Sequence, residues 1–216
     1  MDFLGAYQPD HLAFLLEGFA VTLKVAFSSI ILSFLIGLVI GTLRFAQIPV
    51  LSKILAVVVE TIRNLPLLLI IFFTYFALPE IGIKLSITAS AIAALTVFES
   101  AMLSEIIRSG LKSIDKGQIE AARSSGLTYI QTLKMIIMPQ ALRRMVPPIV
   151  SQFISLLKDT SLAVVIALPE LLHHAQILNG QSQSYLLPIF LLAAMMYFVV
   201  NFSLSLLARR LEYRQA

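Results

Sequence analysis

The chain has 216 residues, of which 58% are hydrophobic and only 13% are charged. This balance excludes a soluble domain, because a soluble domain of this size needs a much more charged surface. The net charge of +4 does not indicate a nucleic-acid partner, and the absence of cysteine excludes disulfides and thiol chemistry. The composition therefore predicts an integral membrane protein in contact with the lipid bilayer.

Five apolar stretches predict membrane-spanning helices, because a helix needs about 20 apolar residues to cross the hydrocarbon core. In chain order they are Phe19–Leu43, Val57–Leu78, Ile87–Ile107, Ala141–Leu157 and Tyr185–Leu207. The fourth is short, and Gly37 and Gly41 in the first predict a face for close helix packing. No soluble linker interrupts the stretches. The sequence thus predicts a single all-α membrane domain over residues 1–216.

Most basic residues fall on one side of these predicted spans. Twelve of the 16 lysines and arginines follow the first, third or fifth span: Arg44, Lys53, Arg108, Lys112, Lys116, Arg123, Lys134, Arg143, Arg144, Arg209, Arg210 and Arg214. Lys84 is the one clearly basic residue of the opposite loops. Because cytoplasmic loops are rich in Lys and Arg, this bias predicts an N-terminus outside the cell and a C-terminus in the cytoplasm.

A polar segment at residues 115–139 separates the third predicted span from the fourth. Asp115 can cap a short helix, with Gln118 in capping-box position, and Gly126 suits the left-handed residue that follows a helix end. A second capping pattern, Thr-x-x-Gln, begins at Thr128. The first helix has about eight residues, too few to be stable alone in water, so we expect it to lie in a groove of a partner protein.

The same segment carries a spaced motif: Glu-Ala-Ala, three residues, Gly, nine residues, then Ile-x-Met-Pro. It resembles the EAA loop of ABC importer permeases, in which a leucine stands where this chain has Met138. The resemblance implies that a coupling helix docks on an ATPase subunit through Glu120, Ala121, Ala122, Arg123 and Gly126. The alternative is an amphipathic surface loop between two spans.

Three further runs resemble the polar amino-acid permeases of the histidine, glutamine and glutamate type: Glu105–Ile114, Leu157–Leu162, and Arg63 with Pro66. This resemblance implies a type I importer in the bacterial cytoplasmic membrane. Such an importer has two permease chains, identical or paralogous, two ATPase subunits and an extracellular or periplasmic binding protein. This chain has no Gly-Lys dipeptide and hence no phosphate-binding loop, so ATP and magnesium are expected on the ATPase and no cofactor or catalytic residue is expected here.

Charged residues inside the predicted spans need a partner or a function, since each costs about 2.5–3.5 kcal/mol to insert. Glu60 and Arg63 are three residues apart, as are Glu105 and Arg108, and we interpret both as neutralising pairs. Glu99 has no basic residue three or four positions away. It is therefore either a residue of the substrate path or one partner of a hydrogen bond between helices.

The end of the fourth span predicts a broken helix inside the membrane. If the helix is continuous from Arg144, Lys158 lies roughly 21 Å inward, past the middle of a core about 30 Å thick. The stretch Leu162–Leu172 is too short to span and predicts a re-entrant helix, capped by residues 159–161. Free N–H groups at such a break suit a substrate carboxylate, although capping alone is the alternative.

The sequence therefore predicts a permease subunit of an ATP-driven importer of polar amino acids, with glutamine or glutamate as the first choice. The expected substrate path comprises Asn64, Glu99, Gln152, Ser155, Lys158, Asp159, Thr160 and Ser161. A cationic amino acid (arginine, histidine or lysine), recognised by Glu99, is the alternative substrate. A stand-alone channel or carrier is the alternative class, and it would need no docking loop. The pair His173–His174 is not expected to bind a metal.

Overall fold

The computed structural model describes residues 1–213, so Arg214, one of the basic residues counted above, lies outside the described part. Helices make up almost all of this part, and it contains no strand, which confirms the all-α prediction. The α-helices are α1 (Phe3–Ala6), α2 (Pro9–Phe45), α3 (Leu51–Asn64), α4 (Leu67–Phe72), α5 (Ile87–Lys112), α6 (Lys116–Ser124), α7 (Tyr129–Thr132), α8 (Met138–Asp159), α9 (Leu171–Gln181) and α10 (Leu186–Tyr213). The π segments are η1 (Phe73–Ala77) and η3 (Leu133–Ile137), and the 3-10 segments are η2 (Leu78–Ile81), η4 (Thr160–Ile166) and η5 (Gln183–Tyr185).

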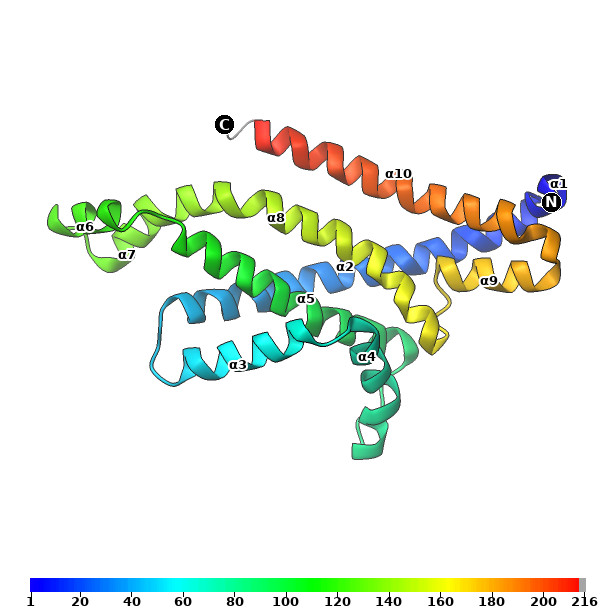
Figure 1. Ribbon diagram of the computed structural model, residues 1–216, viewed down its shortest axis with the longest axis horizontal. Helices are drawn as coiled ribbons and strands as arrows, with labels where there is room; N and C mark the ends of the chain where they lie inside the picture. The colour runs from blue at the N-terminus through cyan, green and yellow to red at the C-terminus, as the bar shows by residue number, and fades with distance from the viewer. Residues whose placement is uncertain (214–216) are drawn as a thin grey trace.

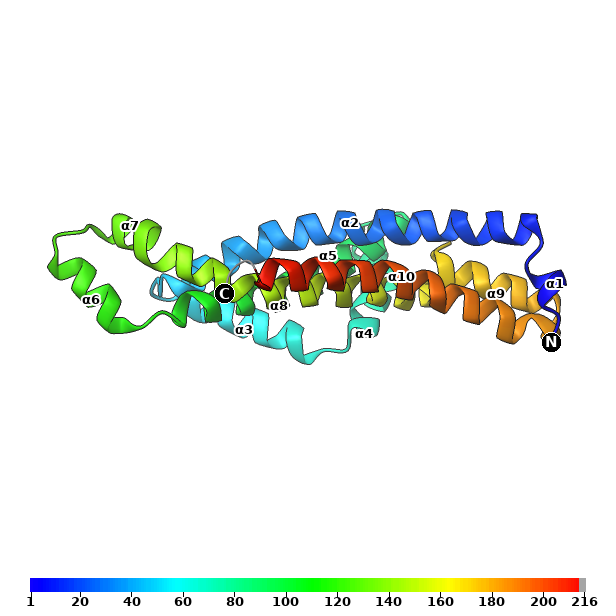
Figure 2. The ribbon, with the colours of Figure 1, turned by 90° about the horizontal axis from the view of Figure 1, so that it is seen from above.

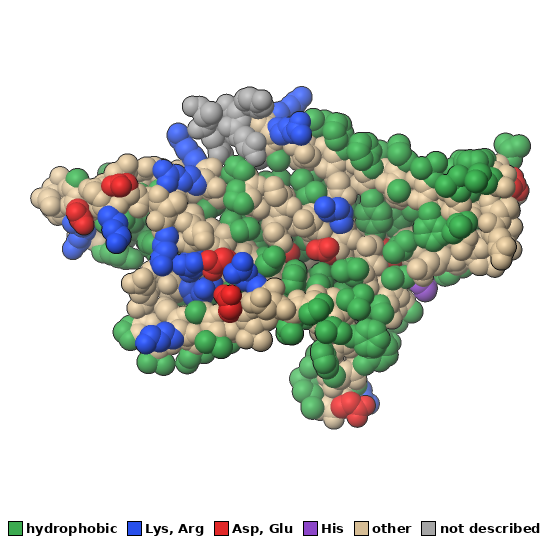
Figure 3. All heavy atoms as spheres, viewed as in Figure 1, with side chains coloured by type: hydrophobic (Ala, Val, Ile, Leu, Met, Phe, Trp, Pro, Cys, Tyr) green, Lys and Arg blue, Asp and Glu red, His purple; other side chains and the backbone are tan. Residues whose placement is uncertain are grey.

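The molecule is elongated, and its long helices α2, α5, α8 and α10 run along the longest axis (Figures 1 and 2). The turn between α2 and α3 lies at the same end as α6 and α7, whereas α9 and the N-terminus lie at the other end. The segment from α4 to η2 projects away from this body (Figure 1). Lys and Arg side chains gather over the end that carries α6 and α7 (Figure 3). We call this the basic end.

Four helical stretches of the described chain are long and apolar enough to cross a membrane: Pro9–Phe45, Ile87–Lys112, Tyr129–Ile166 and Gln183–Arg210. The predicted second span, Val57–Leu78, is wrong as one continuous helix, because α3 and the helix after it are bent by 101°. The break follows from Pro66, which disfavours a helical conformation at Leu65 and cannot donate a backbone hydrogen bond. Counting the bent pair as one span gives the five that the sequence predicts.

Close packing of α2 against α5 confirms the predicted glycine face. A β-carbon on Gly37 would come within 2.9 Å of the β-carbon of Leu103, and one on Gly41 would come within 2.6 Å of the Ser104 carbonyl oxygen. Only glycine therefore allows these two backbones to approach so closely. This contact fixes α5, which carries Glu99, against the longest helix of the chain.

The predicted break at the end of the fourth span is wrong in position. Helix α8 continues directly into η4, because the hydroxyls of Thr160 and Ser161 donate to the carbonyls of Leu157 and Lys158 instead of capping a new helix. The chain turns later, at Ala167, where φ is +56°. The short helix thus occupies Leu171–Gln181 rather than Leu162–Leu172.

Glu170 organises the end of the molecule opposite the basic end. Its Oε1 atom accepts a hydrogen bond of 2.7 Å from the backbone N–H of His173 and so caps α9, while its Oε2 atom accepts from the hydroxyl of Tyr197 at 3.0 Å. His174 stacks on Phe14 with ring centres 3.9 Å apart. In residues 1–213 these side chains form no metal-binding group, so the two histidines have packing and capping neighbours instead.

Candidate coupling and transport site

Helix α6, the predicted coupling helix, begins and ends where the sequence predicts. Asp115 Oδ1 accepts a hydrogen bond of 2.7 Å from the backbone N–H of Gly117, which caps the first turn. Gly126 follows the last turn with φ +86°, and its N–H donates to the Arg123 carbonyl at 3.0 Å. Because a β-carbon on Gly126 would meet nothing within 4 Å, its backbone conformation and not crowding calls for glycine.

The second predicted capping pattern, at the start of α7, is also confirmed. The side chain of Thr128 accepts from the backbone N–H of Gln131, and the side chain of Gln131 accepts from the backbone N–H of Thr128 at 2.8 Å. This reciprocal pair is a complete capping box. The segment is thus helix, tight turn and helix, at the basic end of the molecule.

The capping box predicted at the start of α6 is wrong, because Gln118 bonds to another helix. Its Oε1 atom accepts a 2.6 Å hydrogen bond from Nε2 of Gln140 on α8. One turn further along α8, Arg144 donates to the carbonyl of Ser113, just before α6. We call these two contacts the α6–α8 clamp. They attach the first part of α6 and Ser113, two residues before the α6 cap Asp115, to α8.

The outer face of this loop combines charged and apolar groups. Glu120, Ala121 and Arg123 are exposed, whereas Ala122 is buried against its own chain and is not available to a partner. Sequence reasoning missed the apolar part of the face. Three large apolar side chains of the same loop are exposed as well, with exposed fractions of 54 to 65%: Tyr129, Ile130 and Met135. Large apolar residues in an otherwise polar loop are the feature of the sequence that could have indicated this part of the surface. Together these six exposed residues form what we call the coupling surface.

Two predicted path residues from different helices meet in the interior. Glu99 on α5 is buried, and its Oε2 atom accepts a hydrogen bond of 3.2 Å from Nε2 of Gln152 on α8. The hydrogen bond between helices that the sequence allows is therefore present. The Oε1 atom of Glu99 is also buried and has no partner among the described residues. One oxygen of this carboxyl group therefore receives no hydrogen bond from the described chain.

Further predicted residues extend this site along α8. Gln152, Ser155 and Asp159 are spaced by three and four residues, so they share one face of the helix, and each is partly buried. Lys158 is exposed, and within residues 1–213 it forms no ion pair with Asp159. We call Glu99, Gln152, Ser155 and Asp159 the polar path.

The remaining predicted path residues do not join this group. The amide of Asn64 donates to the Glu60 carbonyl at 2.7 Å, within its own helix α3. The hydroxyls of Thr160 and Ser161 are used within the α8–η4 helix, as described above. Local backbone bonding therefore accounts for these three side chains.

The two predicted ion pairs have different outcomes. Glu105 and Arg108 do pair, and Glu105 also accepts from Nη1 of Arg44 on α2 at 2.9 Å. Glu60 and Arg63 are both exposed and form no pair in the described part of the chain, so that prediction is wrong. Exposed pairs gain little stability, which leaves two long side chains free to point apart.

Residues 29–216 match the family described as binding-protein-dependent transport system inner membrane component. The chain belongs to this family. The match covers every helix discussed above from the middle of α2 onward, including the coupling loop and the polar path. The prediction of an ABC importer permease subunit, and so of a multi-pass plasma-membrane protein rather than an enzyme, is confirmed.

Relatives of the permease span its whole length. It is 80% identical to the probable glutamine ABC transporter permease protein GlnP of Bacillus subtilis over 100% of both chains. It is 34% identical to the glutamate/aspartate import permease protein GltK of Escherichia coli O157:H7, over 95% of each chain. Among solved structures, the crystal structure of an amino acid ABC transporter with histidines superposes with a TM-score of 0.91 at 29% identity, covering 99% of both chains. The type I permease fold is thereby confirmed.

Proposed function

We propose that this permease carries glutamine across the bacterial cytoplasmic membrane. The observation that carries the proposal is its 80% identity, over the full chain, with a permease named for probable glutamine transport. The chemistry of the polar path supports this choice over glutamate. The polar path carries two carboxyl groups, buried Glu99 and partly buried Asp159, which disfavour a third on the substrate, whereas the glutamine amide can donate to them.

A cationic amino acid is the second candidate, and the same two residues favour it. The buried carboxyl group of Glu99 and the partly buried one of Asp159 can neutralise a substrate guanidinium or ammonium group. Gln152 distinguishes the candidates, because its amide already donates to Glu99 and reduces the need for a cation there. We therefore place glutamine first.

The α6–α8 clamp suggests how ATP hydrolysis drives transport. An ATPase subunit, which binds ATP and magnesium, docks on the coupling surface and moves α6. Because Gln140 and Arg144 attach the α6 region to α8, that motion is transmitted along the helix that carries Gln152 and Asp159. A substrate delivered by an extracellular or periplasmic binding protein is thereby released inward along the polar path.

The proposal also includes the orientation of the permease in the membrane and the surface that a second permease chain covers. The basic end carries the coupling surface and faces the cytoplasm, which leaves the N-terminus and α9 outside. The projecting segment from α4 to η2 exposes apolar side chains that a second permease chain, identical or paralogous, can cover: Leu68, Leu69, Phe72, Phe73, Phe76 and Ile81. Two polar paths then lie within one importer.

Uptake by the complete importer tests which amino acid is transported. The permease, its ATPase and its binding protein are reconstituted in vesicles, and uptake of labelled glutamine is measured against unlabelled glutamate and arginine. We expect saturable, ATP-dependent glutamine uptake that arginine does not reduce. Faster uptake of arginine, lost in Glu99→Gln, would establish the cationic alternative. Equal uptake without ATP would establish a stand-alone carrier.

A further inference from the structure

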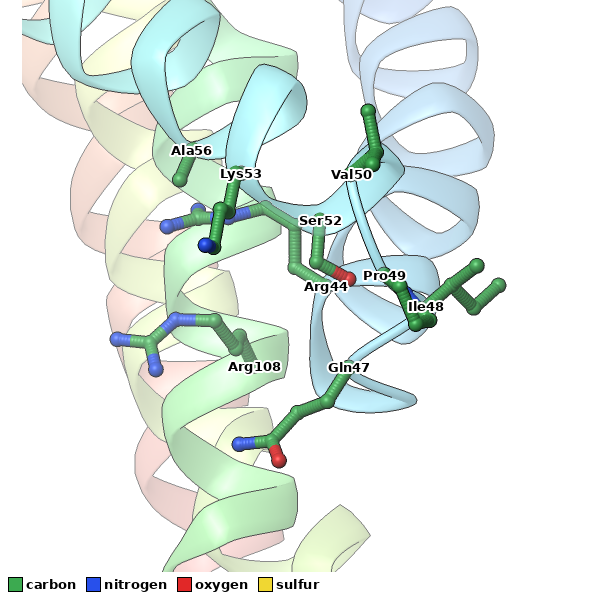
Figure 4. A pocket seen from close by; sticks show the side chains of 9 residues that line it. All are labelled: Arg44, Gln47, Ile48, Pro49, Val50, Ser52, Lys53, Ala56 and Arg108. Atoms are coloured by element: carbon green, nitrogen blue, oxygen red, sulfur yellow. The ribbon is translucent and has the colours of Figure 1, made fainter.

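The turn between α2 and α3 encloses a pocket of about 340 Å³ at the basic end of the molecule. This volume lies in the range of about 300–1,000 Å³ that is usual for small-molecule sites. Arg44, Lys53 and Arg108 place their charged groups on the same side of the pocket (Figure 4). The pocket shares no residue with the coupling surface or the polar path, so the transport function leaves it unexplained.

Positive charge exceeds negative charge around this pocket. Glu105 accepts hydrogen bonds from both Arg44 and Arg108, so one carboxylate faces two guanidinium groups. In the part of the chain that the structure describes, Lys53 is exposed and forms no ion pair. A surplus of two positive charges remains, and guanidinium groups suit the oxygens of a phosphate in particular.

The wall of the pocket is held in a defined shape. Ser52 Oγ donates to the Leu43 carbonyl at 3.1 Å, and the Leu51 N–H donates to the Pro49 carbonyl at 2.8 Å. Val50 has φ +69°, a conformation that side chains rarely adopt and that structure elsewhere must stabilise. The turn is therefore built around the pocket, with the Ser52 hydroxyl and the Gln47 amide among its lining groups.

Exposed apolar residues also belong to this turn. Ile48 and Val50 are among the lining residues, with exposed fractions of 40% and 67%, and their side chains point away from the side of the charged groups (Figure 4). Ile54, in the first turn of α3, is 55% exposed. In a multi-pass membrane protein, apolar groups beside a basic pocket at the end of a span face the region where lipid headgroups meet acyl chains. A free anion would leave these side chains without a partner, whereas a lipid would cover them.

We propose that this pocket binds the phosphate group of an anionic glycerophospholipid, with the acyl chains along Ile48, Val50 and Ile54. Arg108 and Lys53 contact the phosphate oxygens, and Arg44 holds Glu105 so that the two arginines stay in place. The lipid joins the α2–α3 turn to α5 at the basic end. Free phosphate shares the recognition chemistry, and the test separates the two sources. This proposal is independent of which amino acid is transported.

Lipid titration of the full-length permease in neutral detergent tests the site. Short-chain phosphatidylglycerol, short-chain phosphatidylcholine and inorganic phosphate are the probes, with bound lipid counted by native mass spectrometry and thermal unfolding as a second readout. We expect one tightly held phosphatidylglycerol per chain, weaker phosphatidylcholine binding, and no stabilisation by phosphate at the same concentrations. Equal stabilisation by inorganic phosphate would overturn the lipid assignment.

Variants of two exposed lysines locate the bound lipid. Lys53→Ala should weaken phosphatidylglycerol binding about fivefold, the effect of removing one basic residue at a membrane surface, and Lys53→Glu should weaken it further. Lys112→Glu makes the same change of charge at the basic end but outside the pocket, and should leave binding unchanged. Equal effects at both positions would overturn the proposal. So would loss of the lipid when the complete importer assembles, because a protein partner would then fill the pocket.

Discussion

Gly126 offers a test of the coupling helix that depends on backbone conformation alone. Gly126 and Gly180 both have open space where a β-carbon would lie, but only Gly126 has a positive φ. We expect Gly126→Ala to destabilise the turn by roughly 1–2 kcal/mol and to reduce ATPase binding, while Gly180→Ala has little effect. Co-purification of the ATPase with each inserted variant checks this. Equal recovery of the ATPase with both variants would contradict the role assigned to Gly126.

Asp159 tests the polar path. Its side chain makes no capping bond, so Asp159→Asn should change the free energy of unfolding by no more than about 0.5 kcal/mol. Because a partly buried charge of the polar path is removed, uptake by the reconstituted importer should fall at least about tenfold, the usual effect of losing one charge-assisted hydrogen bond. ATP hydrolysis without substrate should persist. Glu60→Gln removes an exposed, unpaired carboxylate on α3 and is the control. Unchanged uptake by Asp159→Asn would remove this residue from the path.

At the level of elements, variants of two adjacent arginines on α8 can distinguish docking of the ATPase from transmission of its motion to α8. Arg144 belongs to the α6–α8 clamp, whereas Arg143 is also exposed but makes no hydrogen bond in the described part of the chain. We expect Arg144→Ala to retain the ATPase but to lose most of the stimulation of ATP hydrolysis by loaded binding protein. Arg143→Ala should keep both the ATPase and the stimulation of ATP hydrolysis. The measurement is ATPase activity in vesicles, and equal stimulation in both variants would show that the clamp transmits nothing.

Elements whose signals are local were predictable from the sequence, and those set by distant contacts were not. Asp115, Gly126 and the Thr128–Gln131 pair mark helix ends correctly, because caps act within four residues. Gln118 was misassigned because its partner lies 22 residues away on another helix. The stretch around Pro66 was predicted as one continuous span because the prediction used its hydrophobicity and did not include the effect of proline on the helix. The meeting of Glu99 with Gln152 also depends on helix packing that the sequence does not show.

For the whole molecule, the distribution of basic residues predicts an orientation that two cysteines can test. The chain contains no cysteine, and Lys116 and Gln181 are exposed near opposite ends of the molecule. We expect an impermeant thiol reagent to label Gln181→Cys in intact cells and Lys116→Cys only after permeabilisation. Labelling of Lys116→Cys from outside would reverse the orientation and place the coupling surface on the wrong side for an ATPase.

Leu65 and Pro66 are exposed and non-helical inside an apolar stretch that is otherwise long enough to cross a membrane. Hydrocarbon cannot satisfy peptide groups, so irregular backbone at that depth persists only against protein or water. The Leu65 N–H donates to the Ile62 carbonyl and the Pro66 carbonyl accepts from the Leu69 N–H, but in the described part of the chain the Leu65 carbonyl has no backbone donor. A lone copy surrounded by lipid would leave that carbonyl without a hydrogen bond. We therefore expect this bend to need cover from a partner chain, so that cells that synthesise the subunit in excess of its partners degrade the surplus.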